Sequence, residues 1–349
     1  QARIITRFLF KVRPKQNIPE LKSKISEKLA KLDSRIFVVI DDIDRLIPEE
    51  IRQIFRLIKA VADFPNIIYI LAFDKDVAIK SLESIQKISG SEYLEKIVQA
   101  SFDVPTPEKS LLNTLFTDKL NQIFNKLPQK AFETNRWQSV FFDGIEKFLS
   151  TPRSVTKFYN SLSITYPALK NEVNPVDFVA IESLRQFSPY AYDIIRLNEK
   201  QFTGEINRSA YSNDKDNEEL IKFHKNWTAQ IPDIEANIVR HILPTIFPKL
   251  STIFAGRNYD SDDPNQWRML RRISHSDIYP VYFGFTVSSN SLPTSEVESV
   301  IKMTGDAKAL EQTLLEFTKK NLSSGKSKVR NLLERLRDYT PSYIPKKNI

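Results

Sequence analysis

The chain has 349 residues, of which 41% are hydrophobic and 27% charged, and it contains no cysteine. This composition is that of a soluble globular protein, and the length exceeds the roughly 250–300 residues that one hydrophobic core usually serves, which predicts two or more lobes. Disulfides and cysteine metal sites are excluded, the three histidines are too dispersed for a histidine zinc motif, and no apolar run approaches the ~20 residues that a membrane helix needs.

The first expected elements are a helix and a buried strand. Residues 18–32 carry apolar side chains at helical spacing. Residues 36–40 are five consecutive apolar residues, a pattern typical of a strand covered on both faces in a parallel α/β sheet. The polarity then changes at once to Asp41 and Asp42. Because ligands of open α/β sheets bind just outside the carboxyl ends of the strands, these two acids are expected at a ligand site.

A magnesium ion that carries nucleotide phosphates suits this acidic pair best. Mg²⁺ prefers hard oxygen ligands, keeps most of its waters and takes one or two carboxylates together with phosphate oxygens. In this reading Asp41 holds the ion through its water shell, and Asp42 lies at the ion and orients and deprotonates the attacking water. The alternative is that one of the two acids only caps the turn that follows, a position that aspartate favours.

Further strands and helices are expected in alternation. A helix should begin at Pro48, and the strand over residues 66–73 should end at Asp74. Two helices should follow over residues 76–88 and 92–99, and a short third strand over residues 101–104. Right-handed crossovers would put all three strand ends on one edge of a doubly wound sheet.

From residue 108 onward the pattern is helical. Thr151-Pro152-Arg153 has the form of a helix start, with Thr as cap and Pro at the first helical position. Residues 213–219 read as a polar loop at a domain boundary, and residues 267–285 as a basic and aromatic stretch. The remaining helices are expected at residues 111–127, 137–149, 178–197, 218–229, 235–242, 296–303, 306–322 and 329–339.

Four ordered motifs resemble the KAP family of P-loop NTPases. They are an apolar strand ending in Asp-Asp-x-Asp-Arg (residues 41–45), a strand ending in Ala-Phe-Asp-Lys (72–75), Tyr-Leu-Glu-Lys-Ile (93–97) and the Thr-Pro-Arg helix start (151–153). The similarity runs from about residue 18 to about residue 204.

The resemblance implies an α/β fold with three parts. Residues 1–105 would be the latter half of a RecA-like P-loop NTPase core with a partial parallel sheet, residues 106–204 an all-helical lid, and residues 205–349 a helical C-terminal domain. It also implies an enzyme, an ATPase that uses ATP and Mg²⁺ to drive assembly or conformational change, in a bacterial anti-phage defence system. Its partners would be further copies of itself or proteins of the same defence operon. The location would be cytoplasmic, and a membrane-bound parent stays open.

The resemblance also assigns roles by position. Asp41 would serve Mg²⁺, Asp42 would polarise water, Asp74 would be a polar sensor, and Arg153 on the first turn of a lid helix would bind the terminal phosphate. The alternative for Asp74 is a helix cap, and for Arg153 a surface ion pair.

Two basic residues are candidates for action between subunits. Arg45 and Lys96 would act on the nucleotide of a neighbouring subunit, as an arginine finger does.

The phosphate-binding loop of the family is absent from this sequence. Such a loop needs Gly-x-x-x-x-Gly-Lys-Ser/Thr after a strand, because its backbone amides and lysine cradle the phosphates. Residues 325–327 are Gly-Lys-Ser, but Lys320 stands where the first glycine belongs, and the segment reads as a turn between two helices. The loop is therefore expected upstream of the acidic strand, and this chain alone is expected to be inactive.

Two non-catalytic functions stay open. The chain can be a binding module that keeps the NTPase fold, or it can bind nucleic acid through the basic and aromatic residues of the later stretch. The net charge of +8 permits this, although lysines interspersed with glutamates usually indicate solvated faces. The residues proposed for nucleic-acid contact are Trp267, Arg268, Arg271 and Arg272.

Overall fold

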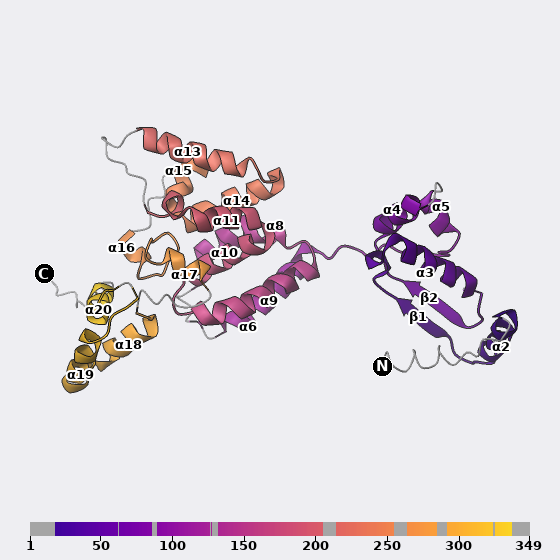
Figure 1. Ribbon diagram of the computed structural model, residues 1–349, viewed down its shortest axis with the longest axis horizontal. Coiled ribbons are helices and arrows are strands. Elements are labelled where there is room, and N and C mark those ends of the chain that lie inside the picture. Colours follow the sequence, from indigo (N-terminus) through magenta and orange to yellow (C-terminus); the bar gives the residue numbers. More distant parts are fainter. Residues whose placement is uncertain are drawn as a thin grey trace. The chain divides into compact units, whose positions relative to one another are not determined.

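The computed structural model describes residues 18–336 apart from residues 62, 86–88, 126, 128–131, 205–213, 255–263, 285–291 and 324. It divides into two compact units, Gln1–Pro105 (unit 1) and Thr106–Ile349 (unit 2). Within the described part, no helix combines the length and the apolar character needed to cross a membrane. The fold is mostly helical with one small parallel sheet, which lies in unit 1 (Figure 1).

Unit 1 alternates helices and strands. Its elements are α2 (Ile18–Ala30), β1 (Ile36–Ile40), the 3-10 helix η1 (Ile43–Arg45), α3 (Pro48–Val61), β2 (Ile67–Leu71), α4 (Lys75–Ile85) and α5 (Gly90–Glu95). β1 and β2 pair in parallel, with the register running from Ile36 opposite Ile67 to Ile40 opposite Leu71. The two strands expected from their apolar runs, and their parallel order, are therefore confirmed.

One face of this sheet is covered by helices. Ile40, Leu71 and Phe73 pack against a cluster of buried side chains from η1, α3, α4 and α5. Because side chains alternate along a strand, Phe37, Val39 and Ile70 lie on the opposite face, where they are 61%, 64% and 46% exposed. Burial of β1 on both faces was expected, but the described residues cover only one.

The expected third strand at residues 101–104 is wrong for the described structure. These residues are irregular, and Phe102 and Val104 are 88% and 92% exposed. A strand requires a hydrogen-bonding neighbour, and the sheet of the described residues consists of β1 and β2 alone. The apolar segment therefore has the composition of a strand without a partner to pair with.

Unit 2 is helical. Its longer helices are α6 (Lys109–Phe124), α7 (Thr134–Val140), α9 (Pro152–Leu169), α10 (Pro175–Phe187), α11 (Pro189–Leu197), α13 (Asp214–Thr228), α14 (Asp233–Ile246), α18 (Thr294–Lys302), α19 (Ala307–Thr318) and α20 (Lys328–Leu336). The short ones are the π-helix η3 (Phe141–Ile145), α8 (Glu146–Phe148), α12 (Glu199–Phe202), η4 (Pro248–Leu250), α15 (Ser251–Phe254), α16 (Pro264–Trp267), α17 (Tyr279–Phe283) and η5 (Met303–Gly305).

One expected loop of unit 2 is wrong. Residues 214–219 belong to α13 rather than to a polar loop. The segment is polar because α13 carries its apolar contacts further along, where Leu220 and Trp227 are buried. Polarity alone therefore did not distinguish a solvated first helical turn from a linker.

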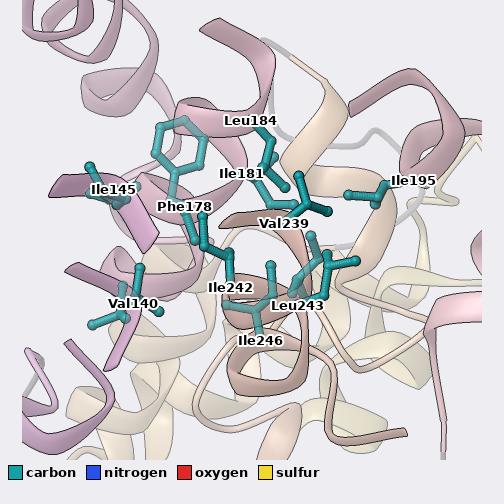
Figure 2. Packing of buried hydrophobic residues seen from close by; sticks show 14 of the residues in the cluster. Val140, Ile145, Phe178, Ile181, Leu184, Ile195, Val239, Ile242, Leu243 and Ile246 are labelled. Atoms are coloured by element: carbon teal, nitrogen blue, oxygen red, sulfur yellow. The ribbon is translucent and has the colours of Figure 1, made fainter. Parts of the chain in front are cut away.

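The main core of unit 2 lies between α7, η3, α10, α11 and α14. Figure 2 shows apolar side chains from these segments packed against one another. α10 is buried over almost all of its length, from Pro175 to Leu184. The last three long helices, α18 to α20, surround a smaller cluster that includes Leu292, Val297 and Leu332.

A buried ionic cluster joins segments of unit 2 that are distant in sequence. Arg136 on α7 is ion-paired with the fully buried Asp177 on α10, 41 residues away. Arg272 donates to Glu133 over 2.8 Å, and the backbone N–H of Ile273 donates to Asp177 over 3.1 Å. Burial raises the pKa of Asp177, and the guanidinium groups of Arg136 and Arg272 act to lower it. Such a cluster fixes its segments in one arrangement, since either charge left alone in the core would be costly.

His224 is a buried titratable group in the same unit. Its Nδ1 accepts from Trp227 Nε1 over 3.1 Å, so in the neutral ring Nε2 carries the proton and donates to the carbonyl of Gln201 over 3.2 Å. Burial lowers the pKa of His224 from 6.5 to about 4. The folded protein therefore holds this side chain neutral over a pH range in which the unfolded chain protonates it.

This shift predicts acid sensitivity of unit 2. Because the folded pKa of His224 lies below the unfolded one, stability is fully present above about pH 6.5 and falls as the pH is lowered towards 4, by about 3 kcal/mol. Urea unfolding followed by fluorescence reports on this unit, since Trp137, Trp227 and Trp267 all lie in it. His224→Gln should lose this part of the pH dependence.

The matched control is His241→Gln, which changes an exposed histidine of α14. It should keep the pH dependence of the wild-type protein. An unaltered slope between pH 6.5 and 4 in His224→Gln would contradict the assignment to this side chain.

Candidate active site

The acidic pair lies at the carboxyl end of β1, where the chain turns sharply. Asp42 has φ 59° and ψ 30°, in the left-handed region that aspartate tolerates better than most residues. The backbone N–H of Asp42 donates to Asp41 Oδ1 over 2.8 Å. The turn leads into η1, whose Ile43 is only 1% exposed and anchors it in the core of unit 1. The two carboxylates are thus held at the strand end by a buried neighbour.

Asp42 also forms an ion pair and a backbone hydrogen bond with Arg45, three residues further on. Arg45 Nε lies 3.0 Å from Asp42 Oδ1, and the backbone N–H of Arg45 donates to the Asp42 carbonyl over 3.1 Å. Both side chains are solvent-exposed, at 61% for Arg45 and 52% for Asp42. This contact was missed from the sequence, although the spacing of three residues was a signal that could have revealed it.

Asp74 occupies the end of the neighbouring strand. The backbone N–H of Ala72 donates to the Ile40 carbonyl over 2.9 Å, so the ends of β1 and β2 are adjacent. Asp74 Oδ1 accepts from the N–H groups of Asp76 at 3.0 Å and Val77 at 3.1 Å. Asp74 therefore caps α4, which is the alternative that the sequence left open.

Arg153 lies in unit 2, on the first turn of α9, and is exposed. Thr151 Oγ1 accepts from the Ser154 N–H over 3.0 Å, and Ser154 Oγ accepts from the Thr151 N–H over 3.2 Å. This capping box, with Pro152 at the first helical position, confirms the expected helix start. Because Asp41, Asp42 and Asp74 belong to unit 1, their meeting with Arg153 stays a prediction.

Two other sequence candidates have simple local settings. Lys96 is exposed at the C-terminal end of α5. Residues 325–327 lie in the turn between α19 and α20, as expected, with Gly325 at φ 79° and an antiparallel bridge between Asn321 and Ser327. A phosphate loop would connect a strand to a helix, so this turn does not have that form.

The basic and aromatic stretch makes contacts inside unit 2. Trp267 and Arg272 are each 3% exposed. Arg268 pairs with Asp277 over 3.2 Å, and Arg271 Nη1 donates to the carbonyl of Asn171 over 2.8 Å. Trp267 and Arg272 are thus buried, whereas Arg268 and Arg271 are partly exposed, and nucleic-acid binding by this stretch stays a prediction.

The acidic edge suits a metal that brings ligands of its own. Among the residues that the structure describes, no group of three or more His, Cys, Asp or Glu side chains is arranged to hold a metal ion. Asp41 and Asp42 supply two exposed carboxylates, which is the protein share that Mg²⁺ takes when phosphates and water complete its shell. The donor set therefore fits Mg²⁺ bound together with a phosphate ligand and does not fit a metal caged by protein alone.

Comparison with known proteins finds a family and a relative that this segment resembles. Residues 2–169 match the model of the KAP family P-loop domain. This segment, just under half of the chain, is therefore similar to that domain. Over 177 residues the chain is also 32% identical to the phage T7 exclusion protein of Escherichia coli (strain K12), a match that covers 50% of this chain and 24% of that protein. The chain thus spans about a quarter of that relative's length. No solved structure matches the chain.

The cap at Asp74 can be tested directly. Asp74→Ala removes the acceptor for two amides of α4 and should destabilise the start of that helix by about 1 kcal/mol. Amide hydrogen exchange of Asp76 and Val77 should then accelerate about fivefold. Asp74→Ser, which restores an oxygen acceptor, should keep the slow exchange. Equal exchange in Asp74→Ala and wild-type protein would contradict the capping role.

Proposed function

We propose that this chain carries the magnesium-binding and water-activating edge of an ATPase that hydrolyses ATP in an Mg²⁺-dependent reaction. The observation that carries the proposal is the parallel pairing of β1 with β2, which puts Asp41, Asp42 and Asp74 at one edge of one sheet. The match of residues 2–169 to the KAP family P-loop domain supports nucleotide chemistry at that edge.

Each side chain has a proposed task. Mg²⁺ bound with ATP supplies a positive charge that neutralises the phosphate oxygens. Asp41 would hold the water shell of the ion, and Asp42 would lie at the ion, orient the attacking water and accept a proton from it. Asp74 senses the bound phosphate in addition to capping α4, and Arg153 presents a planar donor fork to the terminal phosphate. Lys96 is proposed to act on the nucleotide of a neighbouring subunit.

We propose three functional parts along the chain. Residues 1–105 are the latter half of a RecA-like core, residues 106–204 a helical lid and residues 205–349 a helical C-terminal domain. The exposed face of the sheet supports this division, because parallel sheets are normally covered on both faces. Phe37, Val39 and Ile70 are the residues that the phosphate-loop half of the same core would cover. The chain alone is then inactive, since it lacks the glycine-rich loop.

The biological role is proposed from the relative. A protein named for the exclusion of phage T7 is 32% identical over 177 residues, which supports a role in bacterial defence against phage. Hydrolysis would drive assembly or conformational change, either between copies of the protein or with proteins of the same defence operon. We place this activity in the cytoplasm.

The water-activating role of Asp42 can be tested in the full-length parent protein. Asp42→Asn removes the base but keeps the size of the side chain, so folding should be unchanged and Mg²⁺-dependent phosphate release should fall by about 100-fold or more. Circular dichroism and thermal unfolding establish the fold, and chelation with EDTA establishes the metal dependence.

Asp33→Asn is the matched control, because it makes the same charge change at an exposed residue near the opposite end of β1 and should retain most of the activity. Phosphate release by Asp42→Asn at the wild-type rate would remove the proposed mechanism. Lack of hydrolysis by the wild-type parent would favour a non-catalytic binding module that keeps the NTPase fold.

A further inference from the structure

A hydrogen bond and an ion pair between Arg45 and Asp42 close the turn after β1. The backbone N–H of Arg45 donates to the Asp42 carbonyl over 3.1 Å, and Arg45 Nε pairs with Asp42 Oδ1 over 3.0 Å. Between them, Ile43 is 1% exposed and fixes the turn to the core of unit 1. Arg45 therefore acts on both the backbone and the side chain of Asp42.

We infer that Arg45 is a positioning residue that orients the carboxylate of Asp42 within the same subunit. This inference rests on the proposed role of Asp42 in activating water. The ion pair uses Oδ1, which leaves Oδ2 as the oxygen that can accept a proton from the attacking water. A short aspartate side chain reaches little beyond its own backbone, so the direction of its carboxylate depends on the turn and on the group that holds Oδ1.

Because the Arg45–Asp42 pair is exposed, its effect on the orientation of the Asp42 carboxylate can be distinguished from an effect on the stability of the fold. Arg45 and Asp42 are 61% and 52% exposed, and exposed ion pairs contribute little to the stability of a fold. Loss of Arg45 should therefore leave the fold intact and act on the chemical step, since misplacing a reacting group by a small distance slows a reaction strongly. If Arg45 served only the stability of the fold, its loss would destabilise the fold and leave the chemical step unchanged.

This role differs from that of an arginine finger. A finger reaches the nucleotide of another subunit. Here the guanidinium lies 3.0 Å from an acid three residues away in its own chain. The two roles predict different outcomes when defective subunits are mixed.

The first test is steady-state ATP hydrolysis by the full-length parent carrying Arg45→Gln. We expect kcat to fall by about tenfold or more while KM for ATP and the unfolding midpoint stay near the wild-type values. Arg45→Lys, which keeps the charge without the planar group, should recover part of kcat. Arg56→Gln removes the same charge from the exposed surface of α3 and should behave as wild type.

The second test mixes two defective proteins, Asp42→Asn and Arg45→Gln. In the same-subunit arrangement no active site contains both groups, so the mixture should stay as slow as the average of its components. Recovery of hydrolysis on mixing would overturn the inference, because it would mean that Arg45 acts on a neighbour.

The two proposals fail in different ways. A wild-type kcat in Arg45→Gln, with Asp42→Asn still inactive, would overturn the positioning role alone. A raised KM with an unchanged kcat would also overturn it, because Arg45 would then serve nucleotide binding. Absence of hydrolysis by the wild-type parent would overturn the proposed function and this inference together.

Discussion

The parallel pairing of β1 (Ile36–Ile40) with β2 (Ile67–Leu71) is the constraint on which the site depends. In a parallel pair both strands end at the same edge, so the residues that follow them are brought together without any contact between their side chains. An antiparallel pair would send Asp41 and Asp74 to opposite edges. The helix α3 (Pro48–Val61) makes the pairing parallel, because it returns the chain to the start of the sheet.

The elements that could be predicted from the sequence have strong local signals. β1 begins and ends at the residues expected from its uniform apolar run, and α9 begins at Pro152 after the expected threonine cap. These signals depend on residues a few positions apart, which the chain satisfies by itself. The strand expected at residues 101–104 was wrong because a strand also needs a partner, and the apolar pattern does not reveal whether one is present.

Parts of the structure that depend on distant contacts could not be predicted. Asp177 and Arg136 are 41 residues apart, and neither has a local pattern that marks it as buried. In the candidate site, the sequence predicted Asp41 and Asp42 at the end of the strand but not the left-handed backbone of Asp42, because aspartate occurs in other backbone regions as well. The contact of Arg45 with Asp42 is different, because the spacing of three residues could have revealed it.

Each of the two units holds one of the proposed functional side chains in a locally defined setting. Asp42 lies at a strand end in unit 1, whereas Arg153 lies on the capped first turn of α9 in unit 2. Local contacts define both positions. The buried Ile43 fixes the turn that carries Asp42, and the capping box fixes the helix start that carries Arg153. What holds each proposed group in place is therefore local to its own unit.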